Sequence, residues 1–200
     1  MADPDAIVLD VATSADAGLL SNLLELYIHD LSEVFPSVQL GDDGRFGYAN
    51  LPLYWSEPER RLAFIIKCDA RVVGFVLVTC GSPATDDPNV YDIAEFFVVR
   101  RFRRSGVGRR AAVLLWNRLP GRWIVRVAEA NRDALTFWAH VIAEFTSGAA
   151  TECKRSGNPH AWRVFSFECA AQDSTISGEY KGKNISSKCG ERSSASIQVT

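Results

Sequence analysis

The stretch YDIAEFFVVRRFRRSGVGRR, residues 91–110, decides the fold. Its apolar first half predicts a buried strand over 91–99, and the apolar spacing from Gly106 to Leu119 predicts a helix. The first amides of a helix have no partner within it, and the helix dipole adds partial positive charge there. A strand, a glycine loop and a helix in this order therefore suit phosphate binding. We predict that backbone amides next to Gly106 and Gly108 bind the phosphate, with the arginines adding charge.

Two familiar phosphate motifs do not fit these residues. A P-loop needs G-K-[ST] after its glycines, whereas Gly108 is followed by two arginines. A dinucleotide fingerprint reads G-x-G-x-x-G/A, and Ala111 would satisfy its third position, but the chain shows neither the βαβ setting nor the ribose-binding acid. The sequence therefore argues against a nicotinamide cofactor.

The rest of the chain predicts a mixed order of strands and helices around this stretch. A turn at Asp69 and Ala70 joins two apolar runs into a hairpin. Residues 41–59 are rich in Gly, Pro, Asp and aromatic residues, which predicts a long loop of the kind that often serves binding. The predicted strands are 7–13, 61–68, 71–80, 91–99, 123–128 and 161–169, and the predicted helices run from 13 to about 35, from 106 to 119 and from 131 to 145.

Composition limits the classes of protein to which the chain can belong. Its 200 residues are 47% hydrophobic and 23% charged, which suits one globular domain, and the net charge of −2 argues against a general nucleic-acid binder. No secretory signal, membrane span or paired-cysteine pattern is evident, so we expect a reduced, cytoplasmic protein without membrane association. From about Ala170 the chain becomes Ser-rich, so we expect a domain over 1–170 and a flexible tail over 171–200.

Three segments together resemble one known family. Arg103-Arg104-Ser105-Gly106-Val107-Gly108 matches the R/Q-x-x-G-x-G/A signature of the GNAT superfamily, the acyl-CoA-dependent N-acyltransferases. Residues 92–98 are similar to the strand before that signature, and residues 131–138 resemble the family's N-x-x-A-x-x-F-Y helix start. The resemblance implies an α/β fold in which helices flank a mixed, mostly antiparallel sheet. That sheet would splay between the strand ending near Val99 and the strand 123–128.

The same resemblance implies a cosubstrate and the residues that bind it. The chain would move the acetyl group of acetyl-CoA to a primary amine of a small molecule or a protein. Pantetheine would lie along Phe96, Phe97 and Val98. The pyrophosphate would meet Arg103, Arg104, Ser105, Gly106, Val107 and Gly108, with Arg109 nearby, and the cofactor would be bordered by Asn131 and Phe137.

A general base for the amine is expected on the strand before the signature. Glu95 resembles an acidic residue that many family members carry there, and its apolar neighbours should raise its pKa towards a useful range. Asp92 is the second candidate, expected to be exposed to solvent at the strand start, and Glu129 is a weaker third. Strand alternation places Asp92 and Glu95 on opposite faces unless a bulge intervenes.

One position departs from the family pattern in a way that affects the chemistry. Many members have a tyrosine that protonates the departing thiolate where this chain has Trp138, and an indole N–H is no proton source at neutral pH. Tyr48 and Tyr91 are candidate replacements, although their positions in the sequence do not single them out. The three histidines show no metal-ligand spacing, so no metal is expected.

The acceptor side and the alternative functions depend on the first helix and the loop after it. In the family these cover the acceptor end, so an acceptor cleft could be lined by Glu25, His29, Asp30, Glu33, Arg45, Phe46, Tyr48, Tyr54 and Trp55. Ordinary solvation is the competing interpretation of the acidic residues. Two other functions compete with acetyl transfer: a scaffold that holds CoA without turnover, and a nucleic-acid-binding module that uses the arginine cluster.

Overall fold

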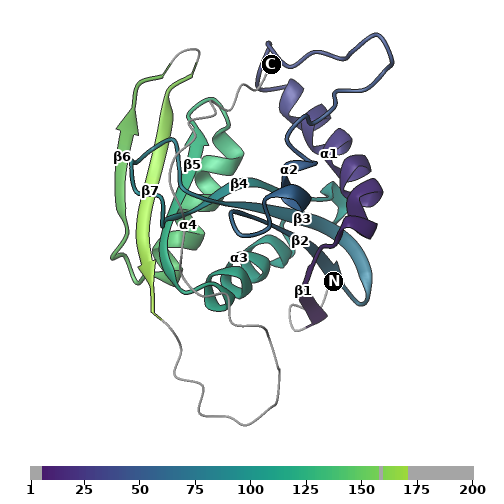
Figure 1. Cartoon of the computed structure of the whole chain (residues 1–200). Helices are drawn as coiled ribbons and strands as arrows, with labels where there is room; N and C mark the ends of the chain where they lie inside the picture. The colour runs from purple at the N-terminus through teal and green to yellow at the C-terminus, as the bar shows by residue number, and fades with distance from the viewer. Residues whose placement is uncertain (1–5, 158–159, 171–200) are drawn as a thin grey trace.

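Seven strands form one mixed sheet in the computed structural model, which describes residues 6–157 and 160–170 (Figure 1). The strands are ordered β1-β2-β3-β4-β5-β7-β6. Their bounds are β1 Ile7–Val11, β2 Arg61–Cys68, β3 Arg71–Cys80, β4 Tyr91–Val98, β5 Gly121–Ala128, β6 Thr151–Arg155 and β7 Trp162–Cys169. The helices are α1 Ala17–Ser32, α2 Leu53–Ser56, α3 Val107–Arg118 and α4 Arg132–Phe145. The predicted flexible tail, 171–200, lies outside the described residues.

Helices cover both faces of this sheet, and alternating strand residues separate two cores. On β2, Phe64 and Ile66 belong to the core formed with α3 and α4, whereas Ala63 and Ile65 belong to the core formed with α1 and α2. Apolar residues on both faces explain why the central strands are near-continuous apolar runs in the sequence. The mixed α/β architecture that the sequence predicts is confirmed.

The sheet splays between its two central strands. β4 and β5 run parallel and pair only at Tyr91↔Trp123 and Asp92↔Ile124. Among the described strands, no partner continues the ladder along this edge of β4 from Ile93 onwards. The splay therefore lies where the sequence predicts it, and it leaves backbone hydrogen-bonding groups of β4 available.

Three elements differ from the sequence prediction. α1 ends at Ser32 and not near Phe35, because the chain turns there and Phe35 packs beside Val38 and Ala128 in a separate cluster. The 41–59 loop contains the one-turn helix α2. β6 was not predicted, since all five of its residues are exposed and it carries no apolar alternation.

The predicted hairpin is confirmed by β2 and β3, which are joined at Asp69 and Ala70. Both residues have positive φ, 49° and 61°, as two-residue hairpin turns commonly require. Within the described part of the chain, no helix combines the length and the apolar character needed to span a bilayer.

Candidate active site beside the splay

A bulge in β4 places the two candidate bases on the same face of the sheet. Glu95 pairs with Leu77 of β3 and Ile93 pairs with Val78, so Ala94 is an extra residue on β4. Asp92 pairs with Thr79, two residues from Leu77, and directly opposed residues of a ladder point to one face. Without a bulge, strand alternation would place Asp92 and Glu95 on opposite faces of the sheet. The bulge brings both carboxylates to the side covered by α1 and α2.

Glu95 lies in a partly buried position between two phenols. Tyr27 of α1 donates a hydrogen bond to Glu95 Oε2 at 2.6 Å, and Tyr48 of the 41–52 segment donates to Oε1 at 3.1 Å. Burial raises the pKa of the carboxyl, while the two phenol donors and the charge of Arg126 lower it, and the pKa settles at about 7. A carboxylate with this pKa can accept a proton near neutral pH.

Asp92 is not exposed to solvent, and the sequence prediction on this point was wrong. The residue is 0% exposed and forms an ion pair with Arg126, whose Nε lies 2.7 Å from Asp92 Oδ2. Ser82 donates a short hydrogen bond to the same oxygen. The segment before β4 and the neighbouring strand β5 cover the strand start, so this carboxylate is enclosed by partners. The ion pair of Asp92 with Arg126 therefore links β4 to β5.

The glycine loop, residues 103–108, contains a left-handed residue at the start of α3. Gly106 is the N-cap of α3 with φ of 86°, and the first intrahelical bond runs from Arg110 N to Gly106 O. The amides of Val107, Gly108 and Arg109 therefore have no partner within α3. A side chain at Gly108 would approach the Phe137 ring to 3.2 Å, so this glycine serves the packing of α3 on α4. A Cβ added at Gly106 would meet no other atom within 4 Å, so a side chain would fit there. Glycine is needed at this position because the backbone is left-handed.

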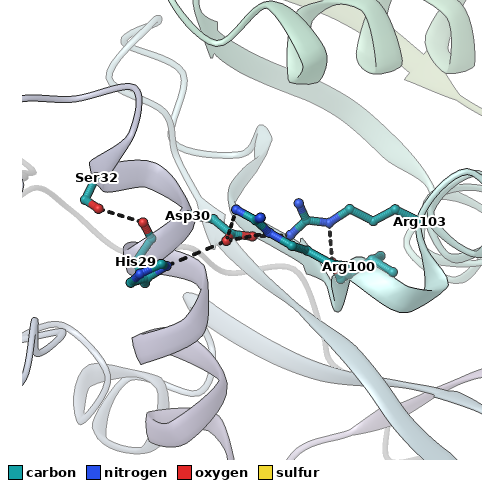
Figure 2. Close-up of polar contacts among 6 residues, drawn as sticks. His29, Asp30, Ser32, Arg100 and Arg103 are labelled. Atoms are coloured by element: carbon teal, nitrogen blue, oxygen red, sulfur yellow. Dashed lines mark hydrogen bonds and ion pairs between the residues drawn. The ribbon is translucent and has the colours of Figure 1, made fainter.

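Arg103 is engaged by protein groups, as Figure 2 shows. Its guanidinium pairs with Asp30 of α1, which also binds Arg100 with a 3.0 Å hydrogen bond from Nε. Burial opposes ionisation of Asp30, but the hydrogen bonds from Arg103 and Arg100 outweigh it and lower its pKa. Asp30, one of the acidic residues considered for the acceptor cleft, joins the end of α1 to the glycine loop through these two arginines.

A second contact of Arg103 reaches the edge of the splay. Arg103 Nε donates to the carbonyl of Val98 at 2.7 Å. The N–H of Val99 donates to Val73 of β3, and the two ends of a trans peptide point in opposite directions, so the Val98 carbonyl faces away from β3. It therefore points towards the splay. Arg103 thus supports the loop beside the predicted pantetheine edge.

The remaining predicted cofactor residues lie around the same end of the splay. Phe96 contacts Phe137 of α4 with ring centroids 6.0 Å apart. Asn131 caps α4 by accepting a hydrogen bond from Ala134 N at 3.1 Å. Arg109 pairs with Glu144 of α4 on the surface. Three other predicted residues are buried: Phe97 packs in the α1 core, and Val98 and Val107 pack in the α3 core. In the loop, Arg104 has a φ of 61°, and the Ser105 hydroxyl donates a hydrogen bond to the carbonyl of Phe102.

Trp138 is a core residue in this structure. It is 6% exposed, and its ring centroid lies 5.0 Å from that of Phe96 and 4.9 Å from that of Phe137. Of the two tyrosines considered as replacements, Tyr91 packs against Trp123 on the α3 face of the sheet, away from Glu95. Tyr48 is the one that contacts Glu95.

Two residues that shape the site make contacts that the sequence did not predict: Tyr27, which was not a candidate, and Glu25, which was considered only for the acceptor cleft. Tyr27 is part of the apolar repeat of α1, and no local pattern indicates that its hydroxyl reaches a residue 68 positions away. Glu25 accepts hydrogen bonds from the backbone of Phe46 at 2.8 Å and of Gly47 at 3.1 Å. Burial opposes its ionisation, but these donors and Arg45 lower its pKa. Glu25 therefore anchors the loop that carries Tyr48.

Candidate metal ligands are scattered in the described ranges, where no three His, Cys, Asp or Glu side chains are grouped so as to hold a metal ion. The site is instead built from one splayed strand pair, one helix N-terminus and one buried carboxylate.

Solved structures with a similar fold include several acetyltransferases. An acetyltransferase from Thermus thermophilus shares 20% identity with a TM-score of 0.55, covering 81% of this chain and 97% of that one. Spermidine N-acetyltransferase from Vibrio cholerae, solved with CoA and spermine, shares 12% identity with a TM-score of 0.56, covering 82% and 96%. AAC(6')-Ib, solved with ribostamycin and coenzyme A, shares 13% identity with a TM-score of 0.61, covering 88% and 100%.

Comparison with curated proteins gives no match. Residues 21–141, more than half of the chain, match the family described as the acetyltransferase (GNAT) family. This range contains α1 from Ser21 on, the splayed strands β4 and β5, the glycine loop and most of α4. The chain therefore belongs to the GNAT family of acetyltransferases.

Proposed function

We propose that this chain transfers the acetyl group of acetyl-CoA to a primary amine, with Glu95 as the general base. The observation that carries the proposal is the placement of a carboxylate with a pKa of about 7 on β4, where that strand separates from β5. A base that titrates near the working pH combines a useful ionised fraction with a useful proton affinity. Five other carboxylates of the described residues show the opposite shift, a lowered pKa, which makes them weaker bases than Glu95: Asp16, Glu25, Asp30, Glu129 and Glu144.

Acetyl-CoA fits the groups that the splay and the loop leave available. The free first-turn amides of α3 suit the pyrophosphate, and the edge of β4 at Phe96, which no strand pairs, suits the pantetheine amides. The Val98 carbonyl on the same edge already accepts a hydrogen bond from Arg103. When bound, acetyl-CoA supplies the activated acetyl thioester. Gly106 sets the direction of the α3 amides, whereas Arg103 and Arg109 act through their ion pairs in support of the loop.

In the chemical step, the chain's contribution is to make the amine nucleophilic. The amine nitrogen forms a bond to the acetyl carbon, the bond from that carbon to sulfur breaks, and the proton lost by nitrogen passes to Glu95. Trp138 is buried and its indole cannot give up a proton at neutral pH, so the leaving thiolate takes its proton from another group or from solvent.

The acceptor class follows from the same carboxylate and from the similar structures. Spermidine N-acetyltransferase was solved with spermine and AAC(6')-Ib with ribostamycin, both of which are amines. In this chain Asp92 is neutralised by Arg126, so Glu95 is the acid available to a cationic amine on the α1 side. We therefore propose a primary amine of a small molecule or a protein as acceptor.

An amine panel tests the proposal directly. The chain is incubated with acetyl-CoA and spermine, ribostamycin or a lysine peptide, and the release of free thiol is followed. We expect thiol release that needs both substrates and that falls about 100-fold in kcat for Glu95→Gln, the size of a general-base contribution. Binding of CoA without thiol release across a broad panel would instead favour a non-catalytic CoA-binding scaffold.

Asp92→Asn is the matched control for this experiment. Asp92 lies three residues from Glu95 on the same face of the sheet, but its partners are Arg126 and Ser82. Its loss should lower the melting temperature and leave the acidic limb of the pH–rate profile in place. If Asp92→Asn removes that limb and Glu95→Gln retains it, the base is Asp92.

The domain limits and the compartment are part of the same proposal. We expect residues 1–170 to form the whole catalytic domain, because 171–200 contains few large apolar residues to add to a core. A chain ending after Ala170 should keep its melting temperature and its CoA affinity, and a fall of several degrees would contradict this limit. A cytoplasmic location fits the proposed use of acetyl-CoA.

A further inference from the structure

Glu95 is held from two sides by tyrosines that come from different parts of the chain. Tyr27 lies on α1 and donates to Oε2, while Tyr48 lies between α1 and α2 and donates to Oε1. An ionised carboxylate is an acceptor only, and each of its oxygens has a second lone pair. Both phenols can therefore stay bonded while an incoming amine, or the water that relays its proton, approaches the same carboxylate.

Both phenols are fixed by contacts of their own. The Tyr27 ring packs edge-on against Phe75 at 5.8 Å and lies 5.9 Å from Phe97, within the core under α1. The Tyr48 segment is attached to α1 through Glu25, which accepts from Phe46 N and Gly47 N. The two donors are therefore parts of the folded core and of an anchored loop, and their geometry does not depend on a bound ligand.

The charged and titratable groups facing Glu95 determine its protonation. They come from α1 (Tyr27), the 41–52 segment (Tyr48), α2 (Tyr54), β4 (Asp92) and β5 (Arg126). Burial and the charge of Asp92 favour the neutral acid, whereas the two phenols and Arg126 favour the carboxylate. Burial also raises the pKa of Tyr27 and Tyr48, so both remain protonated and able only to donate to Glu95 at neutral pH.

We propose that Tyr27 and Tyr48 are positioning residues that hold the Glu95 carboxylate in one orientation and favour its ionised form near neutral pH. Without them the buried carboxyl would keep its proton and could not accept one from the amine. The proposal rests on the proposed function of Glu95 as general base. It adds that α1, through Tyr27, and the loop that Glu25 anchors, through Tyr48, orient the carboxylate of the base.

The test combines kinetics with a measurement that needs no substrate. In the full chain, the carboxyl carbon of Glu95 is labelled with ¹³C and titrated by NMR, and the pH dependence of kcat/KM is recorded with acetyl-CoA and a panel amine. Tyr27→Phe and Tyr48→Phe should each move the NMR midpoint up by about one to two units, the size of one hydrogen bond to a charge. The acidic limb of the rate profile should move by the same amount, with activity regained above the new midpoint.

Tyr91→Phe is the matched control. It removes a phenol hydroxyl from the same strand as Glu95, but on the face that packs against Trp123. The Glu95 midpoint should not move in this variant. If Tyr27→Phe does not fold, Tyr48→Phe carries the test alone. Tyr48 lies in a loop and is only partly buried where it packs against the α1 core, so its substitution should be tolerated.

The outcomes separate this proposal from the proposed function. An unchanged NMR midpoint in a folded Tyr48→Phe and a folded Tyr27→Phe would overturn the positioning role, whatever the activity. A shifted midpoint together with full activity of Glu95→Gln would overturn the role of Glu95 as base while supporting the hydrogen-bonded arrangement. A merely structural role would lower the melting temperature without moving the midpoint, and that result also contradicts the proposal.

Discussion

Gly74 of β3 lies directly against the backbone carbonyl of Phe97 in β4. A Cβ added at Gly74 would overlap that carbonyl oxygen and would also approach the Cα of Val98 at 3.1 Å. These atoms belong to the end of the β3–β4 ladder, where Gly74 pairs with Val98. This glycine therefore permits the close approach that positions the predicted pantetheine edge.

Gly74→Ala should destabilise the fold and weaken CoA binding together. The backbone of β4 must move to admit the methyl group, and overpacking of this kind costs about 1–3 kcal/mol or more. Displacement of Phe96 and Val98 should also weaken CoA binding. Urea denaturation and calorimetry with CoA measure the two effects.

Gly18→Ala is the control with the opposite sign. Gly18 lies in α1 with no atom within 4 Å of its added Cβ, so alanine should stabilise the helix by about 0.5 kcal/mol. Its CoA affinity should equal that of the parent chain. A Gly74→Ala variant as stable as the parent would show that β4 can shift without cost and would contradict the role given to Gly74.

Gly106 and Arg109 give a direct comparison of backbone and side-chain contributions to CoA binding. Gly106 has a positive φ that a β-branched residue strongly disfavours, so Gly106→Val should turn the first amides of α3 away and weaken CoA binding about tenfold or more. Arg109→Ala removes one exposed guanidinium that already pairs with Glu144, and screening limits its effect to about threefold. Calorimetry at moderate salt measures both.

The matched variant at this position is Gly106→Asn. Asparagine tolerates the left-handed region, so it should retain more affinity than valine although it is larger than glycine. A greater loss in Arg109→Ala than in Gly106→Val would mean that side-chain charge, and not the backbone, holds the phosphate.

The strand, loop and helix over 91–118 could be predicted because each depends on local pattern. The apolar run of β4, the glycines of the loop and the apolar spacing of α3 all lie within neighbouring residues. β6 could not be predicted, since an exposed edge strand needs no apolar alternation and its pairing partner β7 specifies it.

The surroundings of the two carboxylates could not be predicted for a different reason. The burial of Asp92 depends on Arg126, 34 residues away, and the phenol on Glu95 Oε2 comes from Tyr27, 68 residues away. Tyrosine in an apolar helical repeat satisfies the pattern whether or not its hydroxyl finds a partner. Sequence could therefore name Glu95 as a candidate base, but only the packing of α1 on the sheet determines which groups surround it.

The pKa of Glu95 also predicts how stability depends on pH. A glutamate exposed to water, as in the unfolded chain, titrates near 4.5, whereas Glu95 titrates at about 7 in the folded protein because burial favours its neutral form. The folded state therefore binds this proton more tightly than the unfolded state. The stabilisation by protonated Glu95 is fully present below pH 4.5 and is lost as pH rises through about 7.

Glu95→Gln should remove that pH dependence, because the amide has no proton to lose and stays neutral in the same site. The difference in free energy of unfolding between Glu95→Gln and the parent should rise with pH between 5 and 8, by about 3 kcal/mol at most. The other carboxylates contribute equally to both chains and cancel in the difference. Urea denaturation at half-unit steps of pH measures it. Glu144→Gln is the control of opposite sign, since the hydrogen bond from Arg109 lowers the pKa of Glu144 and its stabilising effect is lost as pH falls. A difference curve for Glu95→Gln that stays flat from pH 5 to 8 would show that the carboxyl titrates as an ordinary glutamate, and the choice of Glu95 as base would lose its physical support.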